Sequence, residues 1–177
     1  MFPDIKIIIS TWGFDAPDDE GEYEGFFARL DKDLSWADYL LIDAHREYPT
    51  YPLTHPSSKP IVNFPEISMW GLYPWGGFGA NPLPERFQRI WNQSKDILSG
   101  GMPYSEGIYE DILKVQCGGY YWYPDKNYRE ILAEYINYEY SDSVIEDALE
   151  LMRLIEVNHT RIEALEEPDH AAAARAA

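Results

Sequence analysis

The sequence predicts an α/β fold in which short parallel strands alternate with helices. Three apolar, β-branched runs, at residues 5–10, 38–43 and 60–65, are bounded by polar residues or proline. Near-continuous apolar runs of this kind are typical of parallel strands that are buried on both faces of a sheet. Between the first two runs, the segment 22–34 carries apolar residues at helical spacing. It therefore predicts the crossover helix that a parallel pair of strands requires.

The elements that follow are expected to extend this pattern along the chain. Residues 44–59 are rich in proline and predict a loop before the third strand. A strong apolar stripe over 84–98, with proline at its first position and two glycines just after it, predicts a helix. Residues 102–105 then predict a fourth short parallel strand, and 108–122 a further helix.

The C-terminal part of the chain is expected to be helical. An Asn-x-x-Glu sequence starting at Asn127 and a Ser-x-x-Glu sequence starting at Ser143 have the spacing of capping boxes. They predict helices over 128–138 and 144–165. The longer helix is amphipathic, so we expect it to pack on the α/β part or on another chain. The apolar residues of its stripe are Val144, Ala148, Leu151, Leu154 and Ile155.

The charge and composition argue against several classes of partner. The chain has 177 residues, with 14 basic and 31 acidic side chains and a net charge of −17. Nucleic acid and anionic membranes are therefore not expected as partners. Neither a basic leader pattern nor an apolar run of membrane-spanning length is seen in the sequence, which favours a cytoplasmic location. The single cysteine, Cys117, lies in an apolar stretch and is expected to be a buried, inert thiol.

Carboxylates and aromatic rings follow the expected strands at their carboxyl ends, where parallel α/β folds form ligand sites. Sugar rings pack on aromatic faces, and glycosidic cleavage uses a pair of carboxyl groups. The pattern therefore predicts a carbohydrate site with Glu66 and Glu106 as catalytic candidates. The substrate-binding candidates are Trp12, Asp43, His45, Trp70, Trp75 and Tyr104.

Each catalytic candidate also has a structural interpretation. Glu66 can be explained by hydrogen bonds to the backbone or to a nearby arginine, and Glu106 by stabilisation at a helix N-terminus. Glu110 and Asp111 are expected on the solvated first turn of the following helix, outside the site. Asp43 and His45 are two residues apart, so their side chains would share one side of a strand. With four histidines and neither an HxH nor an HExxH pattern, neither a metal site nor a cofactor is expected.

The stretch GGMPYSEGIYEDILKVQCGGYYWYPDKNYREILAEYINYEYS resembles the last strand, last barrel helix and appended helical region of (β/α)8-barrel glycoside hydrolases. The group includes β-N-acetylhexosaminidase-like and α-glucuronidase-like enzymes and their uncharacterised bacterial relatives. Residues 121–125 stand in the place of its YxWxPD motif, and 130–135 in the place of its EILxEY motif. The resemblance implies that 60–66 is the seventh barrel strand and 102–106 the eighth, with Glu66 near the sugar.

A full barrel needs about 200 residues or more, which is longer than the α/β part of this chain. The resemblance therefore implies a partial, half (β/α)8 barrel over 1–123, a C-terminal helical extension over 124–167 and a disordered tail over 168–177. Half a barrel leaves sheet edges open, so a homo-oligomer or a complementing barrel half is the expected protein partner.

Three functions are compatible with this sequence. The favoured one is the C-terminal portion of a glycoside hydrolase that acts on an oligosaccharide or glycoside. The alternative is a non-catalytic carbohydrate-binding or assembly subunit, which keeps the aromatic residues without a complete pair of catalytic carboxyl groups. A protein-interaction module built on the helix over 144–165 ranks last, because it gives the N-terminal aromatic residues no role.

Overall fold

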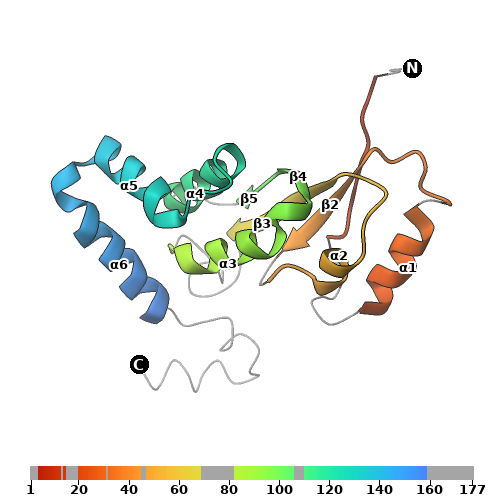
Figure 1. Ribbon diagram of the computed structural model, residues 1–177, viewed down its shortest axis with the longest axis horizontal. Helices are drawn as coiled ribbons and strands as arrows, with labels where there is room; N and C mark the ends of the chain where they lie inside the picture. The colour runs from red at the N-terminus through yellow and green to blue at the C-terminus, as the bar shows by residue number, and fades with distance from the viewer. Residues whose placement is uncertain are drawn as a thin grey trace. The chain divides into compact units, whose positions relative to one another are not determined.

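The chain forms a mixed α/β structure in which parallel strands make a curled half-barrel accompanied by several helices (Figure 1). The computed structural model describes residues 4–12, 14, 20–30, 32–44, 47–68, 82–105 and 110–158. The chain divides into two compact units. Unit 1 comprises Met1–Glu66 and Arg89–Pro103, and unit 2 comprises Ile67–Gln88 and Tyr104–Ala177.

The parallel sheet runs in the order β1-β2-β3-β4. Ile9 of β1 pairs with Leu40 of β2, and Leu40 pairs on its other side with Ile61 of β3. The four strands are β1 (Ile8–Ser10), β2 (Tyr39–Ala44), β3 (Ile61–Ser68) and β4 (Leu98–Gly101). A two-residue strand, β5 (Tyr104–Ser105), pairs with β3 off this path. The first three predicted strands and their parallel arrangement are confirmed.

The fourth strand is not where the sequence indicated. It covers Leu98–Gly101, where we expected the end of a helix and its glycine stop. Of the predicted strand over 102–105, only Tyr104–Ser105 forms a strand, β5, which lies off the main sheet order. Leu98 faces Ile61 and Gly101 faces Asn63, and the Met102 N–H donates to the Asn63 carbonyl at 2.7 Å. The open edge of β3 satisfies these backbone groups, which outweighs the weak strand propensity of glycine.

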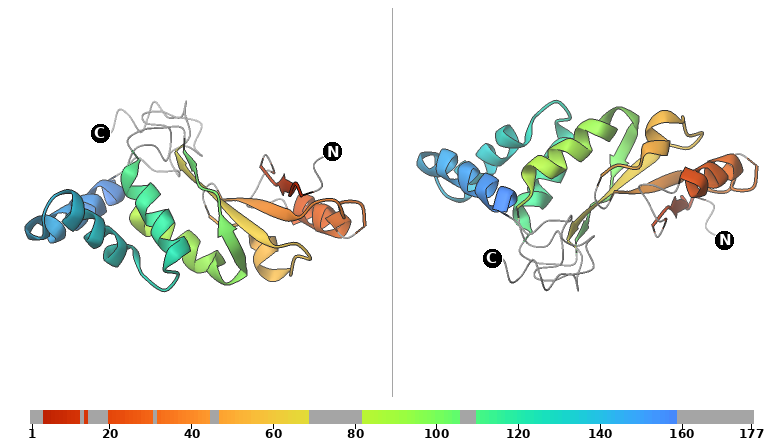
Figure 2. Two further views of the ribbon diagram at one scale, coloured as in Figure 1. Left: turned by 90° about the horizontal axis from the view of Figure 1, so that it is seen from above. Right: turned by 90° about the horizontal axis from the view of Figure 1, so that it is seen from below.

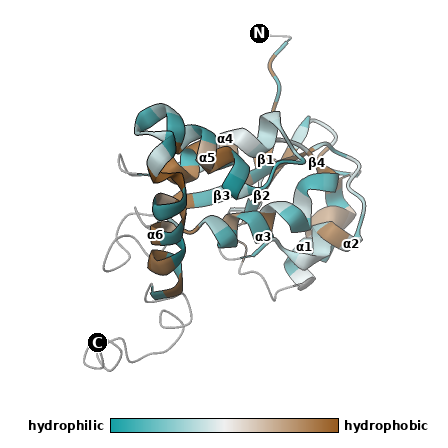
Figure 3. Ribbon diagram, turned by 60° about the vertical axis from the view of Figure 1, so that its left-hand side comes forward, coloured by the Kyte–Doolittle hydropathy of each residue, from teal (hydrophilic) through white to brown (hydrophobic). Residues whose placement is uncertain are grey.

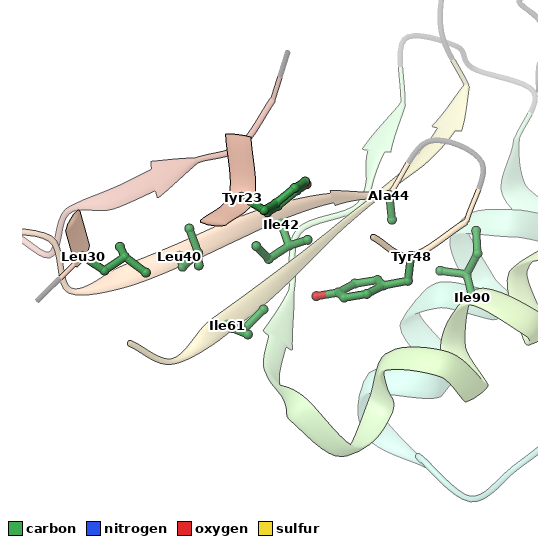
Figure 4. Packing of buried hydrophobic residues seen from close by; sticks show 8 residues of the cluster. All are labelled: Tyr23, Leu30, Leu40, Ile42, Ala44, Tyr48, Ile61 and Ile90. Atoms are coloured by element: carbon green, nitrogen blue, oxygen red, sulfur yellow. The ribbon is translucent and has the colours of Figure 1, made fainter. Parts of the chain in front are cut away.

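One face of the sheet is buried against helices α1 (Glu20–Leu30) and α2 (Thr50–Thr54). Figure 4 shows the buried residues of this core. The even-numbered residues of β2 point into this core, so the odd-numbered Leu41 and Asp43 lie on the opposite face. The short helix α2 corrects the prediction that 44–59 is only a loop. The buried core residues are Tyr23, Leu30, Leu40, Ile42, Ala44, Tyr48, Ile61 and Ile90.

Helix α3 (Pro84–Ser94) begins at the predicted proline but ends four residues early. At its end the Ser94 hydroxyl donates to the Ile90 carbonyl at 2.9 Å, and a 3-10 turn over Lys95–Ile97 leads into β4. At its start the Glu156 carboxylate accepts hydrogen bonds from the Glu85 and Arg86 amides, at 2.9 and 2.8 Å.

The helices of unit 2 lie side by side along the chain order (Figures 1 and 2). They are α4 (Asp111–Trp122), α5 (Tyr128–Glu139) and α6 (Ile145–Asn158). The predicted capping box of α5 is confirmed, because Asn127 and Glu130 bond each other's backbone amides through their side chains. The second predicted capping box is wrong. A 3-10 turn over Asp142–Val144 precedes α6, and Ser141 caps that turn.

Helix α6 packs on α5, and only part of the predicted face is buried there. Leu149 and Met152 are buried with residues of α5, and the predicted Ala148 packs against this cluster. Of the other predicted packing residues, Ile155 is partly buried, whereas Val144, Leu151 and Leu154 are 38%, 58% and 43% exposed. Hydrophobic and hydrophilic residues alternate along this helix in Figure 3. Within the described ranges, no helix has the length and apolarity that crossing a membrane requires.

Candidate functional site

Three polar residues of unit 1 are buried at the carboxyl ends of neighbouring strands. Thr11 follows β1 and is 0% exposed, Asp43 lies in β2 and is 6% exposed, and Glu66 lies in β3 and is 1% exposed. Acidic side chains are seldom buried to this extent unless they are paired or functional. We call these three residues the carboxyl-end site.

Strand register puts the two carboxylates of this site on the same face of the sheet. Asp43 is aligned with Phe64, and Glu66 lies two residues beyond Phe64 on the same strand. Side chains alternate along a strand, so Asp43, Phe64 and Glu66 share one face, opposite the core beneath α1 and α2. With strands about 4.8 Å apart and about 3.3 Å per residue, the Cα atoms of Asp43 and Glu66 are offset by about 8 Å.

Thr11 fixes the backbone at this end of the sheet. Its hydroxyl accepts a hydrogen bond from the Asp43 amide at 3.2 Å and one from the Tyr23 hydroxyl at 3.3 Å. It donates to the Leu41 carbonyl at 3.5 Å, and the Thr11 amide donates to the same carbonyl at 3.0 Å. Strands β1 and β2 and helix α1 are therefore joined at the backbone amide of Asp43.

The Tyr23 hydroxyl is held in its neutral form. Burial raises the pKa of Tyr23 to about 12, and the negative charges of Asp43 and Glu22 act in the same direction. The hydrogen bond with Thr11 acts the opposite way but is outweighed. Tyr23 consequently remains a hydrogen-bond donor at neutral pH and adds no charge next to Asp43.

Sequence reasoning missed two polar residues in this region. Tyr23 was not singled out, although its spacing with Phe26 and Phe27 placed it on the buried face of the helix. Asn63 is 2% exposed, and its side-chain oxygen has no hydrogen-bond partner among the described groups. The signal for Asn63 was an amide in the middle of an apolar strand.

The structure brings together only part of the predicted site. Trp12 follows Thr11 at the end of β1 with its side chain 63% exposed, and its amide donates to the Ser10 hydroxyl. Tyr104 is partly buried and lies in β5, in unit 2. The remaining candidates lie outside the described residues; they are His45, Trp70, Trp75 and Glu106.

Glu110 corrects the expectation of a solvated helix turn. Its side chain is only 4% exposed and accepts a hydrogen bond from the Ser105 hydroxyl at 2.9 Å. The Lys114 ammonium lies 3.4 Å from the same carboxylate. Asp111, the first residue of α4, is exposed as predicted. Glu110 is therefore a buried residue that ties β5 to α4.

Over the described ranges, no three histidine, cysteine, aspartate or glutamate side chains are grouped closely enough to hold a metal ion. Comparison of the chain with protein-family models, curated proteins and solved structures finds no match. The functional argument therefore depends on the geometry of the carboxyl-end site.

Proposed function

We propose that the carboxyl-end site binds carbohydrate and that the chain is the C-terminal portion of a glycoside hydrolase acting on an oligosaccharide or glycoside. The observation that supports this proposal is the shared face of Asp43 and Glu66, two buried carboxylates at the ends of adjacent parallel strands. Ligand sites of parallel α/β folds form at this end of the strands.

In this proposal the two carboxylates act in glycosidic cleavage, which requires two carboxyl groups with different roles. One carboxyl group protonates the leaving oxygen, and the other acts as nucleophile or activates water, at separations of about 5 to 9.5 Å. A Cα offset of about 8 Å allows carboxyl groups on flexible side chains to reach that range. Glu66 is the catalytic candidate, Asp43 serves as the second carboxylate or as a ligand for sugar hydroxyls, and Trp12 offers its exposed ring as a stacking surface.

The proposal includes a finer architecture, a half (β/α)8 barrel with a C-terminal helical extension. In the described part of the sheet, β1 and β4 each have a neighbouring strand on one side only. Ile5, Ile7 and Ile8, at the β1 edge, are 61%, 40% and 45% exposed. Apolar edges of parallel sheets are normally covered, so we propose that a second copy of the chain, or a complementing barrel half, covers this one.

The test uses the full chain with a panel of fluorogenic glycosides and, in parallel, calorimetric titration with oligosaccharides. Glu66→Gln and Asp43→Asn remove charge but keep shape, so each is expected to reduce hydrolysis at least about a hundredfold. Glu47→Gln is the matched control, because Glu47 is an exposed carboxylate of the same unit, paired with Arg89 at 3.4 Å. Equal activity in all three variants would contradict the assignment.

The exposed ring of Trp12 also supports the alternative, a non-catalytic carbohydrate-binding subunit. In that case the chain binds oligosaccharide without hydrolysing any glycoside of the panel, and Trp12→Ala weakens binding while Glu66→Gln changes it little. Absence of both binding and hydrolysis across the panel would contradict both functions.

A further inference from the structure

Unit 2 contains a groove between helices α4 and α5 that has no role in the carbohydrate proposal. Its volume is about 300 Å³, at the lower end of the range for small-molecule sites. Aromatic rings from both helices dominate its walls, together with two aliphatic side chains, two glycines and one carboxylate. The lining residues used here are Trp122, Tyr123, Ile131, Glu134, Tyr135 and Tyr138.

Two consecutive glycines of α4 line the groove. A Cβ atom at Gly119 would lie 2.6 Å from the Ile131 side chain, so glycine allows α5 to approach closely. A Cβ atom at Gly118 would meet nothing within 4 Å. The glycines have no side chains that could cover the neighbouring aromatic rings, and Trp122 is 82% and Tyr138 85% exposed.

A positive charge of the chain itself is already held at the rim of this groove. The Lys126 ammonium lies 4.5 Å from the centroid of the Tyr123 ring and forms an ion pair with Glu134. Cations over aromatic faces are stabilised by the negative potential of the ring. The negative charges of Asp111 and Glu139 also act on the groove. The pKa of Tyr135, which lines it, is raised mainly by burial and further by these two carboxylates.

The polar groups of the groove decide which kind of cation fits. A primary ammonium has three N–H donors that need acceptors, and the nearest carboxylate, Glu134, already bonds Lys126. A neutral sugar can also pack on aromatic rings, but it gains nothing from the negative charges around this groove. An alkylated ammonium ion needs no hydrogen bond and gains from ring faces and negative charge alone.

We propose that the groove between α4 and α5 binds the alkylated ammonium group of a small organic cation. Trp122, Tyr123, Tyr135 and Tyr138 provide the ring surfaces. Lys126 offsets the charge of Glu134, and the charges of Asp111 and Glu139 leave the surroundings of the groove negative. The net charge of −17 favours accumulation of cations around the chain as a whole.

The test is calorimetric titration of the full chain with choline and with 3,3-dimethylbutan-1-ol, which has the same shape without the charge. Choline is expected to bind about threefold to thirtyfold more tightly than the neutral alcohol. Trp122→Ala and Glu134→Gln should each weaken choline binding at least about threefold, whereas Trp122→Phe keeps a ring and should retain most of the affinity. Lys126→Gln removes the competing internal cation and should strengthen binding.

Trp36→Ala is the control for loss of an exposed tryptophan, because Trp36 belongs to unit 1, is 53% exposed and is not among the residues that line the groove. It should leave choline binding unchanged. Equal binding of choline and the neutral alcohol, or no saturable binding below roughly 10 mM, would overturn the proposal. No sugar is used in this test, so its outcome is independent of the carbohydrate proposal.

Discussion

Thr11 joins two strand ends and a helix through one small hydroxyl group. The group makes three hydrogen bonds, to the Asp43 amide, the Tyr23 hydroxyl and the Leu41 carbonyl. Such a fully satisfied polar group rigidifies its surroundings, whereas a partly satisfied one is costly to bury. The backbone that carries Asp43 is thereby fixed without using the Asp43 carboxylate, which leaves that carboxylate to other interactions.

Cys117 provides a prediction at the residue scale. Burial raises the pKa of its thiol to about 12, and the positive charge of Arg86 opposes this only in part. The neutral thiol is favoured in the folded state, so this contribution to stability is present below the ordinary thiol pKa of about 8.5 and is lost as pH rises towards 12. At pH 8 an aromatic disulfide reagent should label Cys117 only as fast as the protein unfolds, and immediately in denaturant. Rapid labelling of the folded chain would contradict this burial.

The position of a residue was easier to predict than its partners. Asp43 and Glu66 were found because a carboxylate at the end of an apolar strand is conspicuous in a sequence. The hydrogen bond from Ser105 that helps to bury Glu110 joins residues five positions apart, and no local sequence pattern predicts it. Tyr23 has the spacing of an ordinary core residue, so only coordinates show that its hydroxyl contacts Thr11.

At the scale of elements, helix α3 is held at its start by a residue of α6. Glu156 is 8% exposed and accepts hydrogen bonds from two amides of the first turn of α3. Those amides have no partner within the helix, and the helix dipole favours negative charge there. The Gln116 side chain of α4 also donates to the Pro84 carbonyl at 2.8 Å. Helices distant in sequence thus meet at one helix end.

The adjacent glycines of α4 give a matched prediction about helix packing. Gly119→Ala places a Cβ 2.6 Å from the buried Ile131, so we expect the free energy of unfolding to fall by about 1 to 3 kcal/mol. Gly118→Ala meets no atom within 4 Å and should raise it by about 0.5 to 1 kcal/mol, because alanine favours the helix. Urea unfolding of both variants measures the difference. Equal effects would mean that α4 and α5 do not approach at Gly119.

Element boundaries were predictable where local chemistry sets them. The start of α5 follows from Asn127 and Glu130, two residues within a four-residue stretch that carries its own capping interactions. Strand β4 was missed because its position depends on the free edge of β3, which lies more than thirty residues earlier in the sequence. The packing face of α6 was predicted only in part for the same reason. The surface of α5 determines that Leu149 and Met152 become buried, and this surface is not evident from the sequence of α6 alone.

At the scale of the whole molecule, two exposed apolar surfaces are candidates for contact with another chain. One is the β1 edge. There the backbones of Ile7 and Thr11 form hydrogen bonds with β2 or the residue before it, so the backbone groups of the alternate residues Ile8 and Ser10 point away from β2. The other is the exposed face of α6. Both belong to a chain of net charge −17, whose self-repulsion opposes association at low ionic strength.

Light scattering can distinguish these surfaces. We expect the chain to self-associate, and more strongly in high salt, because screening weakens the repulsion between acidic copies. Ile8→Lys puts a charge on an edge strand, a common device against edge pairing, and should shift the chain towards monomer. Leu151→Lys is the matched change on α6, because Leu151 is 58% exposed and Ile8 is 45% exposed. If the β1 edge is the interface, Leu151→Lys should leave association unchanged. Dissociation by Leu151→Lys alone would identify α6 as the interface and favour a helical interaction module. A monomeric chain at all salt concentrations would contradict association through either surface, because exposed apolar side chains gain most from burial when charge repulsion is screened.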